Sequence, residues 1–240
     1  MSKITLASAQ INTTVGDIDY NTKKIINFIK KAEKKKVDIL AFPELTITGY
    51  PPEDLVHYDH FVSSNIKKLK EISKSVKNTT VVIGFVNKIK NRLYNSAAIM
   101  ENKKIKYIYN KIHLPNYGVF DEKRYFYPGE EIPILEINNT KIGISICEDI
   151  WEKESPVSIQ ARQGAQIIIN INSSPFEYDK YRKRVNLIKK ISKENNVYIL
   201  YTNQVGGQDE LVFDGGSLLT NNCGEIISSS KRFEEQLMIT

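Results

Sequence analysis

Short apolar runs alternate with longer amphipathic stretches along the chain, and this alternation predicts a mixed α/β protein. The short runs are rich in β-branched residues, which favour buried strands, whereas apolar residues three or four positions apart favour helices. Helices are expected after Asp19, a candidate N-cap, near 61–77 and over 179–196. The expected strands cover 3–11, 37–44, 79–86, 140–147, 164–172 and 197–205.

The order of these elements indicates a single domain. Residues 95–111 are expected to form a β-hairpin that turns near Asn102 and Lys103. No repeat or low-complexity linker interrupts the pattern, so we expect one domain over residues 1–240, with strands packed under helices. The sequence stops at EEQLMIT, inside a strand-like pattern, and we expect Thr240 to mark the edge of a domain taken from a longer protein.

The composition is that of an ordinary soluble globular protein, with 41% hydrophobic and 26% charged residues. The longest apolar runs are far shorter than the roughly 20 residues that span a bilayer. The N-terminus also lacks the long apolar core of a signal peptide. We therefore expect no membrane contact and a cytoplasmic location.

The net charge is +6, and the excess comes from lysine, since only six of the 34 basic residues are arginine. Arginine is the residue favoured for phosphate and base recognition. The lysines follow the polar faces of predicted helices, as in 21–36 and 63–77. This pattern indicates solvated surfaces, so nucleic acid is not an expected partner.

The chain contains two cysteines, Cys147 and Cys223, and no CxxC pair, which argues against a disulfide framework and a structural zinc site. Cys223 lies in the turn-like stretch TNNCGEI and is expected to be structural or exposed. His57 and His60 are three residues apart, but no third ligand accompanies them, so no metal is expected.

Three reactive side chains each end a strand-like run and begin a loop: Glu44 in ILAFPEL, Lys111 in YIYNKIHLP and Cys147 in GISICED. If these strands lie side by side, the side chains converge at one edge of a sheet, where catalytic groups often lie. A thiol that attacks an amide needs a base, such as Glu44, and a cation such as Lys111 would stabilise the oxyanion. This scheme requires no histidine. Each residue also has an ordinary explanation, as a surface or capping acid, a surface lysine and a core cysteine.

At the motifs FPEL, NKIHLP and ICEDIW the sequence resembles the nitrilase superfamily, whose members share a Glu-Lys-Cys triad on an α-β-β-α sandwich. The longer stretches PELTITGYPPEDL, KIHLPNYGVFDEKRYF, NSSPF and NQVGGQDELVFDGGS are similar to the glutaminase domains of glutamine-dependent NAD synthetases. These stretches are spread over the chain from end to end. The resemblance implies a single α/β domain of the nitrilase type that hydrolyses the side-chain amide of glutamine.

The resemblance assigns a role to each reactive residue. It makes Cys147 the nucleophile that forms a thioester, and Glu44 the general base. Lys111 and the backbone N–H of Glu148 would be the two oxyanion donors. Glu122, in FDEKRYF, matches a second glutamate that many members place beside the lysine. Its carboxylate would hold Lys111 charged and oriented, with a surface ion pair as the alternative.

The resemblance also implies a glutamine pocket built from loops. Its walls would include Tyr117 and Phe120 of NYGVF and Ser174 of NSSPF. Trp151 is either a further wall of the pocket or a core residue. Tyr50, with the two prolines that follow it, is expected to form a rigid turn at the pocket mouth.

Both charges of glutamine need partners in such a pocket. The α-carboxylate requires a cation, for which Lys180 and Arg184 are candidates, and the α-ammonium requires an acid, for which Glu148 is a candidate. Neither the pocket nor the triad calls for a metal or an organic cofactor.

One part of the synthetase pattern is missing from the sequence. The family also carries an ATP-pyrophosphatase domain with a phosphate loop of the SGGxDS type, and neither this motif nor GxxxxGK[ST] occurs in the 240 residues. ATP, Mg²⁺ and deamido-NAD would therefore be used by a synthetase domain or subunit, the expected partner, to which this chain would supply ammonia. Because nitrilase-type domains usually self-associate, a homo-oligomer is also expected.

Three other functions remain open from the sequence. A different nitrilase-type carbon–nitrogen hydrolase, such as an ω-amidase or an N-carbamoyl hydrolase, would carry the same triad with another pocket. A non-catalytic partner domain would keep the fold alone. A papain-like thiol–imidazole pair would use His113, which lies two residues from Lys111.

Overall fold

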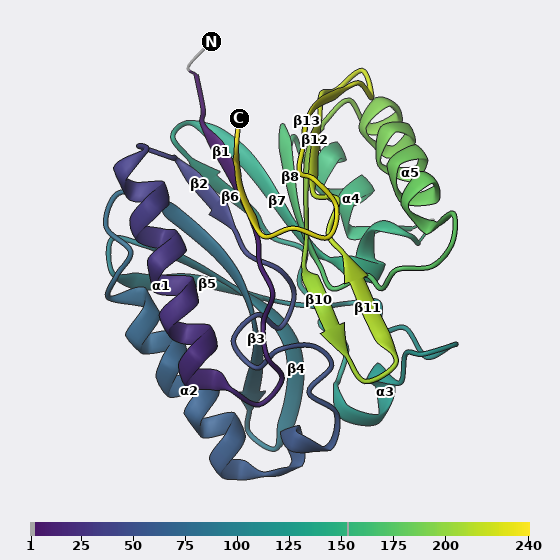
Figure 1. The fold of residues 1–240 in the computed structure, drawn as a ribbon. Coiled ribbons are helices and arrows are strands. Elements are labelled where there is room, and N and C mark those ends of the chain that lie inside the picture. The colour runs from purple at the N-terminus through teal and green to yellow at the C-terminus, as the bar shows by residue number, and fades with distance from the viewer. Residues whose placement is uncertain (1–2, 153) are drawn as a thin grey trace.

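The computed structural model describes residues 3–152 and 154–240 and shows two β-sheets that face each other, with helices against the outer face of each (Figure 1). The layers are helix, sheet, sheet and helix, so the predicted α-β-β-α sandwich is confirmed. The first and last strands meet at one end of the sandwich, since Leu6 and Thr240 exchange backbone hydrogen bonds of 2.8 and 2.9 Å.

The first sheet has six strands in the order β14-β1-β2-β3-β4-β5. Strands β1 to β3 run parallel, and the remaining pairs are antiparallel. Two helices, α1 (Ile18–Lys34) and α2 (Asp59–Ser73), cover its outer face, and the short 3-10 helix η1 (Glu53–His57) precedes α2. The strands are β1 (Leu6–Gln10), β2 (Ile39–Ala41), β3 (Thr80–Ile89), β4 (Arg92–Glu101), β5 (Lys104–Asn110) and β14 (Gln236–Ile239).

The second sheet also has six strands, in the order β13-β12-β9-β8-β7-β6, and its central strands β7 to β9 run parallel. Helices α4 (Pro156–Arg162) and α5 (Lys180–Asn195) cover its outer face. The strands are β6 (Ile134–Ile137), β7 (Thr140–Ile146), β8 (Ile167–Asn172), β9 (Tyr198–Asn203), β12 (Leu218–Thr220) and β13 (Ile226–Ser229). A separate hairpin comprises β10 (Val205–Gln208) and β11 (Leu211–Asp214), and α3 (Glu122–Tyr125) is a single helical turn.

The two sheets divide the apolar core into three layers. Ile144 of β7 and Ile169 of β8 belong to the layer between the sheets, whereas Ile168 of β8 and Ile199 of β9 belong to the layer under α4 and α5. Because both faces of these parallel strands are buried, their sequences are continuous apolar runs. This burial accounts for the run QIIININ, which shows no polar alternation over its first residues.

Two predicted boundaries differ from the structure. The N-cap of α1 is Asp17, not Asp19, because the helix begins at Ile18 and the Asp17 carboxylate accepts from the Tyr20 N–H at 2.9 Å. Asp19 lies in the first turn and pairs with Lys68 at 2.8 Å. Strand β2 keeps three residues of the predicted strand 37–44, because the chain leaves the sheet after Ala41.

The predicted hairpin turn is confirmed. Asn102 and Lys103 join β4 to β5 with φ angles of +50° and +62°. Positive φ at both central residues matches the right-handed twist of the flanking strands. None of the helices among the described residues is long and apolar enough to span a membrane.

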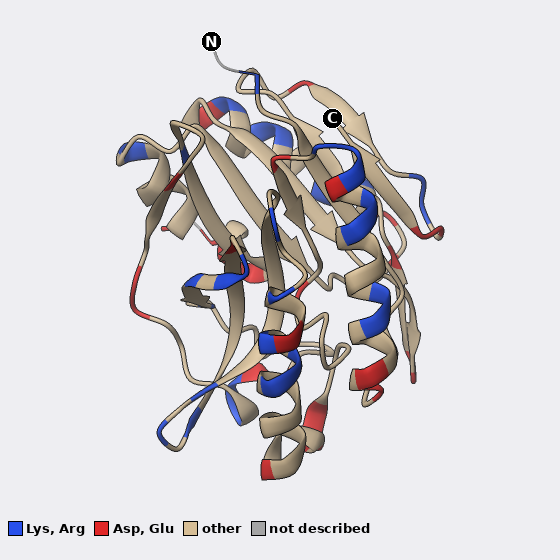
Figure 2. Cartoon of the chain, turned by 90° about the vertical axis from the view of Figure 1, so that its left-hand side faces the viewer, with Lys and Arg blue, Asp and Glu red and all other residues tan. Residues whose placement is uncertain are grey.

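The basic residues are distributed along helices and loops, with acidic residues between them (Figure 2). Several helix lysines make exposed ion pairs, such as Lys68 with Glu71 at 2.9 Å and Lys190 with Glu194 at 3.9 Å. Such pairs contribute little to stability because solvent screens them. The excess of lysine is thus spread over solvated helices.

Candidate active site

Glu44 lies in the loop that follows β2, and its side chain is fully buried. Its backbone N–H donates to the Asn172 carbonyl at 3.4 Å, and its own carbonyl accepts from the Ser173 hydroxyl at 3.0 Å. Asn172 ends β8. These bonds therefore tie the end of a strand in the first sheet to the end of a strand in the second.

This loop needs a glycine on the neighbouring strand. A Cβ atom on Gly84 of β3 would lie 2.2 Å from the Leu45 nitrogen and 2.6 Å from the Glu44 carbonyl carbon. Leu45 itself has a φ of +44°, a conformation that L residues rarely adopt. Close backbone packing therefore sets the position of Glu44, and a larger residue at 84 would displace it.

Lys111 follows β5 and is equally inaccessible to solvent. Its backbone N–H donates to the Asn95 carbonyl at 2.8 Å. Its ammonium lies 2.7 Å from Glu44 Oε1 and 2.8 Å from Glu122 Oε1. The fold thus brings together one buried cation and two buried carboxylates from three separate segments.

Cys147 begins the 3-10 turn η2 (Cys147–Ile150) directly after β7, with a φ of +44° and a buried side chain. Burial raises the pKa of its thiol well above the usual value, the charge of Glu44 adds to this rise, and Lys111 opposes it. Backbone contacts bring the three segments together. Ile146 pairs with Ile171, beside the Asn172 carbonyl that accepts from the Glu44 N–H, and Asp149 of η2 accepts from the Ile112 N–H, next to Lys111. A protonated thiol beside a carboxylate can pass its proton to that carboxylate as it attacks.

Hydrogen bonds from neighbouring residues hold both carboxylates in place. Asn95 Nδ2 donates to Glu44 Oε1 at 2.7 Å and to Glu122 Oε2 at 3.4 Å. The Ser173 N–H donates to Glu44 Oε2 at 2.9 Å, and the Tyr50 hydroxyl donates to Glu122 Oε1 at 3.2 Å. Asn95 and Ser173 were missed by sequence reasoning. The signal for Asn95 was a polar residue at the start of the apolar run NSAAIM.

The two carboxylates share a single ammonium, and this affects the proton affinity of Glu122. Burial raises the pKa of Glu122 to about 7, the charge of Glu44 adds to the rise, and Lys111 opposes it. If both carboxylates are ionised, the three side chains carry a net negative charge inside the protein. The cluster therefore takes up a proton near neutral pH.

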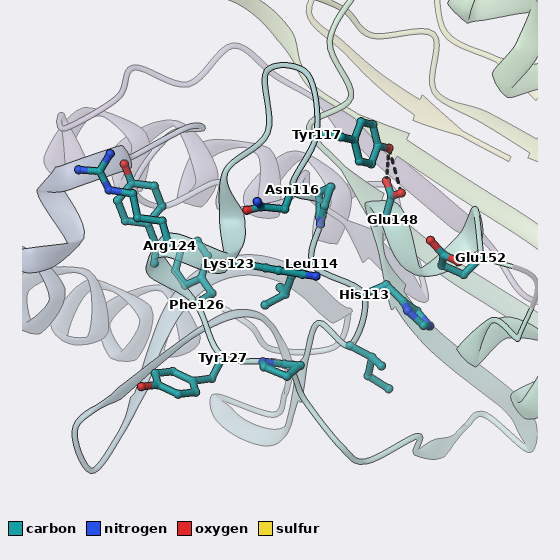
Figure 3. Close-up of a pocket in the computed structure, with 14 residues that line it drawn as sticks. His113, Leu114, Asn116, Tyr117, Lys123, Arg124, Phe126, Tyr127, Glu148 and Glu152 are labelled. Atoms are coloured by element: carbon teal, nitrogen blue, oxygen red, sulfur yellow. Dashed lines mark hydrogen bonds between the residues drawn. The ribbon is translucent and has the colours of Figure 1, made fainter.

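Four of the residues predicted for the substrate pocket lie together. The Tyr117 hydroxyl donates to Glu148 Oε1 and Oε2 at 2.9 and 3.0 Å (Figure 3). The Phe120 ring meets the Tyr117 ring edge-on, with centroids 5.6 Å apart. The Lys180 ammonium lies 5.6 Å from the Phe120 ring centroid and also pairs with Glu177 at 2.6 Å. An acid, two aromatic rings and a cation therefore form one continuous group.

Two cavities lie beside this group. The larger, about 850 Å³, is lined by residues 112–117 and 123–128 together with Glu148 and Glu152. In Figure 3, Tyr117 and Glu148 lie at one side of this cavity and Lys123 extends into it. The smaller, about 240 Å³, is lined by Tyr50, Glu122 and neighbouring residues of η1 and α3. The larger cavity thus reaches Tyr117 and Glu148 and the smaller reaches Glu122, whereas neither is lined by Glu44, Lys111 or Cys147.

Ser174 and Arg184 are both buried and contact each other. Ser174 is buried, its N–H is held by Asn203 Oδ1 at 2.9 Å, and its carbonyl accepts from Arg184 at 3.3 Å. The buried Arg184 guanidinium lies 2.7 Å from both carboxylate oxygens of Asp214. Asp214 is fully buried and neutralises Arg184, whereas the acid paired with Lys180, Glu177, is exposed to solvent, so Lys180 is the better placed of the two candidates.

The remaining predicted residues have different surroundings. Trp151 is partly buried and packs against the apolar layer under α4 and α5, which favours its interpretation as a core residue. His113 lines the larger cavity, and Cys223 is exposed in its turn. Within residues 3–152 and 154–240, no group of three or more histidine, cysteine or acidic side chains is arranged to hold a metal.

The family description "Carbon-nitrogen hydrolase" matches residues 5–240. The chain therefore belongs to the carbon–nitrogen hydrolase family, that is, to the nitrilase superfamily. Its fold agrees with this assignment: an amidase from Nesterenkonia sp. superimposes with a TM-score of 0.88 at 24% identity, over 99% of this chain and 89% of that one.

Glutamine-dependent NAD(+) synthetases are more similar to this chain than the amidase is. The chain is 42% identical to the glutamine-dependent NAD(+) synthetase of Thermotoga maritima and 40% identical to that of Aquifex aeolicus, over 99% and 98% of its own length. It spans only 42% and 41% of those proteins. The structure of glutamine-dependent NAD+ synthetase from Acinetobacter baumannii, in complex with ADP, matches with a TM-score of 0.95 at 39% identity, over 98% of this chain and 45% of that one. The chain thus corresponds to the carbon–nitrogen hydrolase domain of such synthetases.

Proposed function

We propose that this chain hydrolyses the side-chain amide of L-glutamine through a thioester on Cys147 and releases ammonia. The observation that carries the proposal is the buried pair of Glu44 and Lys111, 2.7 Å apart, held by backbone contacts to the strand end next to the buried Cys147. The glutamine dependence in the names of its relatives supports the choice of substrate.

In the first step, the Cys147 sulfur forms a bond to the amide carbon while its proton passes to Glu44. The amide oxygen becomes an oxyanion that needs donors. A lysine ammonium has three N–H groups, and two of those on Lys111 bond to the glutamates. The third is left for the oxyanion, and the backbone N–H of Glu148 supplies a second donor.

In the second step, the tetrahedral intermediate collapses. Glu44 returns its proton to the amide nitrogen, the carbon–nitrogen bond breaks, and ammonia leaves with a γ-glutamyl thioester behind. A water molecule then attacks the thioester and gives its proton to Glu44, which passes it to the departing Cys147 sulfur. One glutamine and one water thus give glutamate and ammonia, and the enzyme returns to its starting protonation.

The pocket residues match the two charges of glutamine. Glu148 would bind the α-ammonium, with Tyr117 holding its carboxylate in place. Lys180 would bind the α-carboxylate, and Phe120 would separate the two charged groups. Ser174 would complete the wall.

In this function the partner is a synthetase domain or subunit that uses the ammonia. As the resemblance to the family implies, it would amidate deamido-NAD with ATP and Mg²⁺, whereas the hydrolysis itself would use no cofactor. Self-association and a cytoplasmic location belong to the same proposal. The chain spans about two fifths of those relatives. A rate of glutamine hydrolysis measured on this chain alone is therefore a rate without the synthetase partner.

The test compares ammonia release from glutamine, asparagine and N-carbamoyl amino acids. We expect kcat/KM to be at least about 100-fold higher for glutamine. An N-carbamoyl amino acid lacks the α-ammonium and would leave Glu148 unpaired, and asparagine is one methylene shorter, so that pairing both of its charges would hold its amide away from the Cys147 sulfur. Cys147→Ser should abolish the reaction, and Cys223→Ser, the matched control, should not change it. Equal rates on all the amides would contradict a specificity for glutamine and would favour a carbon–nitrogen hydrolase of broader specificity.

A second arm separates a slow enzyme from a non-catalytic domain. The glutamine-like electrophile diazo-oxo-norleucine should add covalently to Cys147 even if turnover is slow, because alkylation requires no hydrolysis. Mass spectrometry locates the adduct. No adduct at saturating reagent, together with no ammonia from any amide, would support a non-catalytic partner domain.

A further inference from the structure

Asp149 is a fully buried carboxylate that the proposed reaction does not use. It lies two residues after the thiol, in η2, and receives four hydrogen bonds. Its Oδ2 accepts from the Ile146 N–H at 2.9 Å and from the Tyr109 hydroxyl at 2.7 Å. Its Oδ1 accepts from the Ile112 N–H at 3.1 Å and the His113 N–H at 2.9 Å.

These four donors come from both sheets. Ile146 directly precedes Cys147 at the end of β7, and Ile112 directly follows Lys111 after β5. Strands β5 and β7 belong to different sheets, so no strand pairing fixes their separation. Three of the four bonds join η2, which follows β7, to the segment around Lys111, and the Asp149 side chain thus connects the two segments.

The carboxylate is suited to this task because all four partners are donors. Ionised oxygens accept every one of these bonds, whereas a protonated acid would direct an O–H toward a donor. Burial raises the pKa of Asp149, and the bonds from His113, Ile146 and Tyr109 lower it. An asparagine has one acceptor oxygen and would leave at least one donor pair facing an NH₂ group.

We propose that Asp149 is a positioning residue that fixes the Lys111 ammonium relative to the Cys147 sulfur, by holding the peptides next to both. The proposal rests on the proposed function, in which these two groups act on one carbonyl. It also explains how Cys147 keeps its unusual backbone conformation, since Asp149 binds the N–H of the preceding residue.

The test measures the Cys147 thiol directly, without glutamine. Iodoacetamide alkylation is followed against pH in Asp149→Asn and in the parent, both carrying Cys223→Ser because that exposed thiol would also react. Removing a negative charge alone would lower the pKa of a nearby thiol. Displacing Lys111 would raise it, since Lys111 lowers the thiol pKa in the native site. We expect the midpoint of alkylation to move to higher pH.

Steady-state ammonia release supplies the second readout. In Asp149→Asn we expect kcat to fall by about 10- to 100-fold, the effect of displacing reacting groups by about 1 Å, with a smaller change in KM. The control is Asp38→Asn. Asp38 directly precedes β2, at the opposite end of that strand from Glu44. Asp38 also accepts a backbone N–H, from Thr5 at 2.7 Å, but lies away from the cluster. It should lower the melting temperature without changing either readout.

Tyr109→Phe keeps the experiment decisive if Asp149→Asn does not fold. It removes one bond to Asp149, and we expect a smaller shift of the alkylation midpoint in the same direction. Tyr107→Phe, on the same strand, removes a bond to Glu131 and should leave the midpoint unchanged.

An unchanged or lower midpoint in Asp149→Asn would overturn the proposal. So would a wild-type midpoint in Tyr109→Phe if the asparagine variant fails to fold. If the parent protein released no ammonia from glutamine, the proposed function would fail, yet the alkylation midpoints would still report whether Asp149 positions Lys111.

Discussion

The Lys111 ammonium lies 2.7 Å from Glu44 Oε1, and neither side chain is exposed to solvent. Charges buried in this way depend on their partners, because water cannot replace a lost one. The Glu122 carboxylate, 2.8 Å from the same ammonium, makes the arrangement asymmetric, with two acids for one base. The consequences of removing each member therefore differ.

Lys111→Met and Glu44→Gln should separate stability from catalysis. Lys111→Met leaves two buried carboxylates without a cation, and we expect it to lower the free energy of unfolding by about 3–5 kcal/mol. Glu44→Gln leaves Lys111 paired with Glu122, so its stability should change by less than about 1.5 kcal/mol. Both should lose nearly all ammonia release. Urea unfolding measures the first quantity, and equal destabilisation in the two variants would contradict the buried-cluster geometry.

Glu122 should make stability depend on pH. Its pKa is raised from 4.5 to about 7 in the folded protein. Between these values the folded state binds more protons than the unfolded state, so stability falls as pH rises. At about 1.4 kcal/mol per pKa unit, the loss is at most about 3.5 kcal/mol. Glu122→Gln should remove this part of the pH dependence, as measured by denaturant unfolding between pH 5 and pH 8. Parallel curves for the two proteins would show that Glu122 ionises normally.

Substrates that lack one charge of glutamine test the pocket. Glutaramate lacks the α-ammonium, and 4-aminobutyramide lacks the α-carboxylate. Glu148→Gln should lower kcat/KM for glutamine by about 10- to 100-fold, mainly through KM, but hardly change it for glutaramate. Lys180→Met should behave in the same way toward 4-aminobutyramide. Equal losses on all three amides would mean that these residues do not contact the substrate charges.

Gly84→Ala tests whether backbone packing places Glu44. The added Cβ would lie 2.2 Å from the Leu45 nitrogen, so the loop must move. We expect kcat to fall by about 100-fold, as for other small displacements of a catalytic group. Gly207→Ala is the matched control, because the nearest atom to its Cβ would be 3.4 Å away. Activity retained in Gly84→Ala would show that the loop position is not critical.

Much of the fold was predictable because its central strands are buried on both faces. Their continuous apolar runs stand out against the amphipathic helices. Cys147 directly follows the buried strand β7 and Glu44 lies shortly after the buried strand β2, whereas Lys111 follows β5, a partly exposed strand at the edge of its sheet. The hairpin β10–β11 was not predicted, since its glycines read as a loop, and neither was β6, which has only four residues.

The residues that hold the cluster were harder to predict. Asn95, Tyr109 and Ser173 act through contacts between segments distant in sequence, and each lies inside or beside an apolar run that does not mark it as functional. Arg184 shows the opposite problem. As a cation in a predicted pocket segment it suggests substrate binding, but its guanidinium is paired with Asp214, 30 residues away in the chain.

The central claim is that glutamine becomes attached to Cys147. The most direct measurement is tandem mass spectrometry of the protein, quenched with acid during turnover of saturating glutamine. The account predicts a γ-glutamyl group on Cys147, and none in Cys147→Ser. Ammonia release by Cys147→Ser at the wild-type rate, or a γ-glutamyl group on another residue, would contradict it.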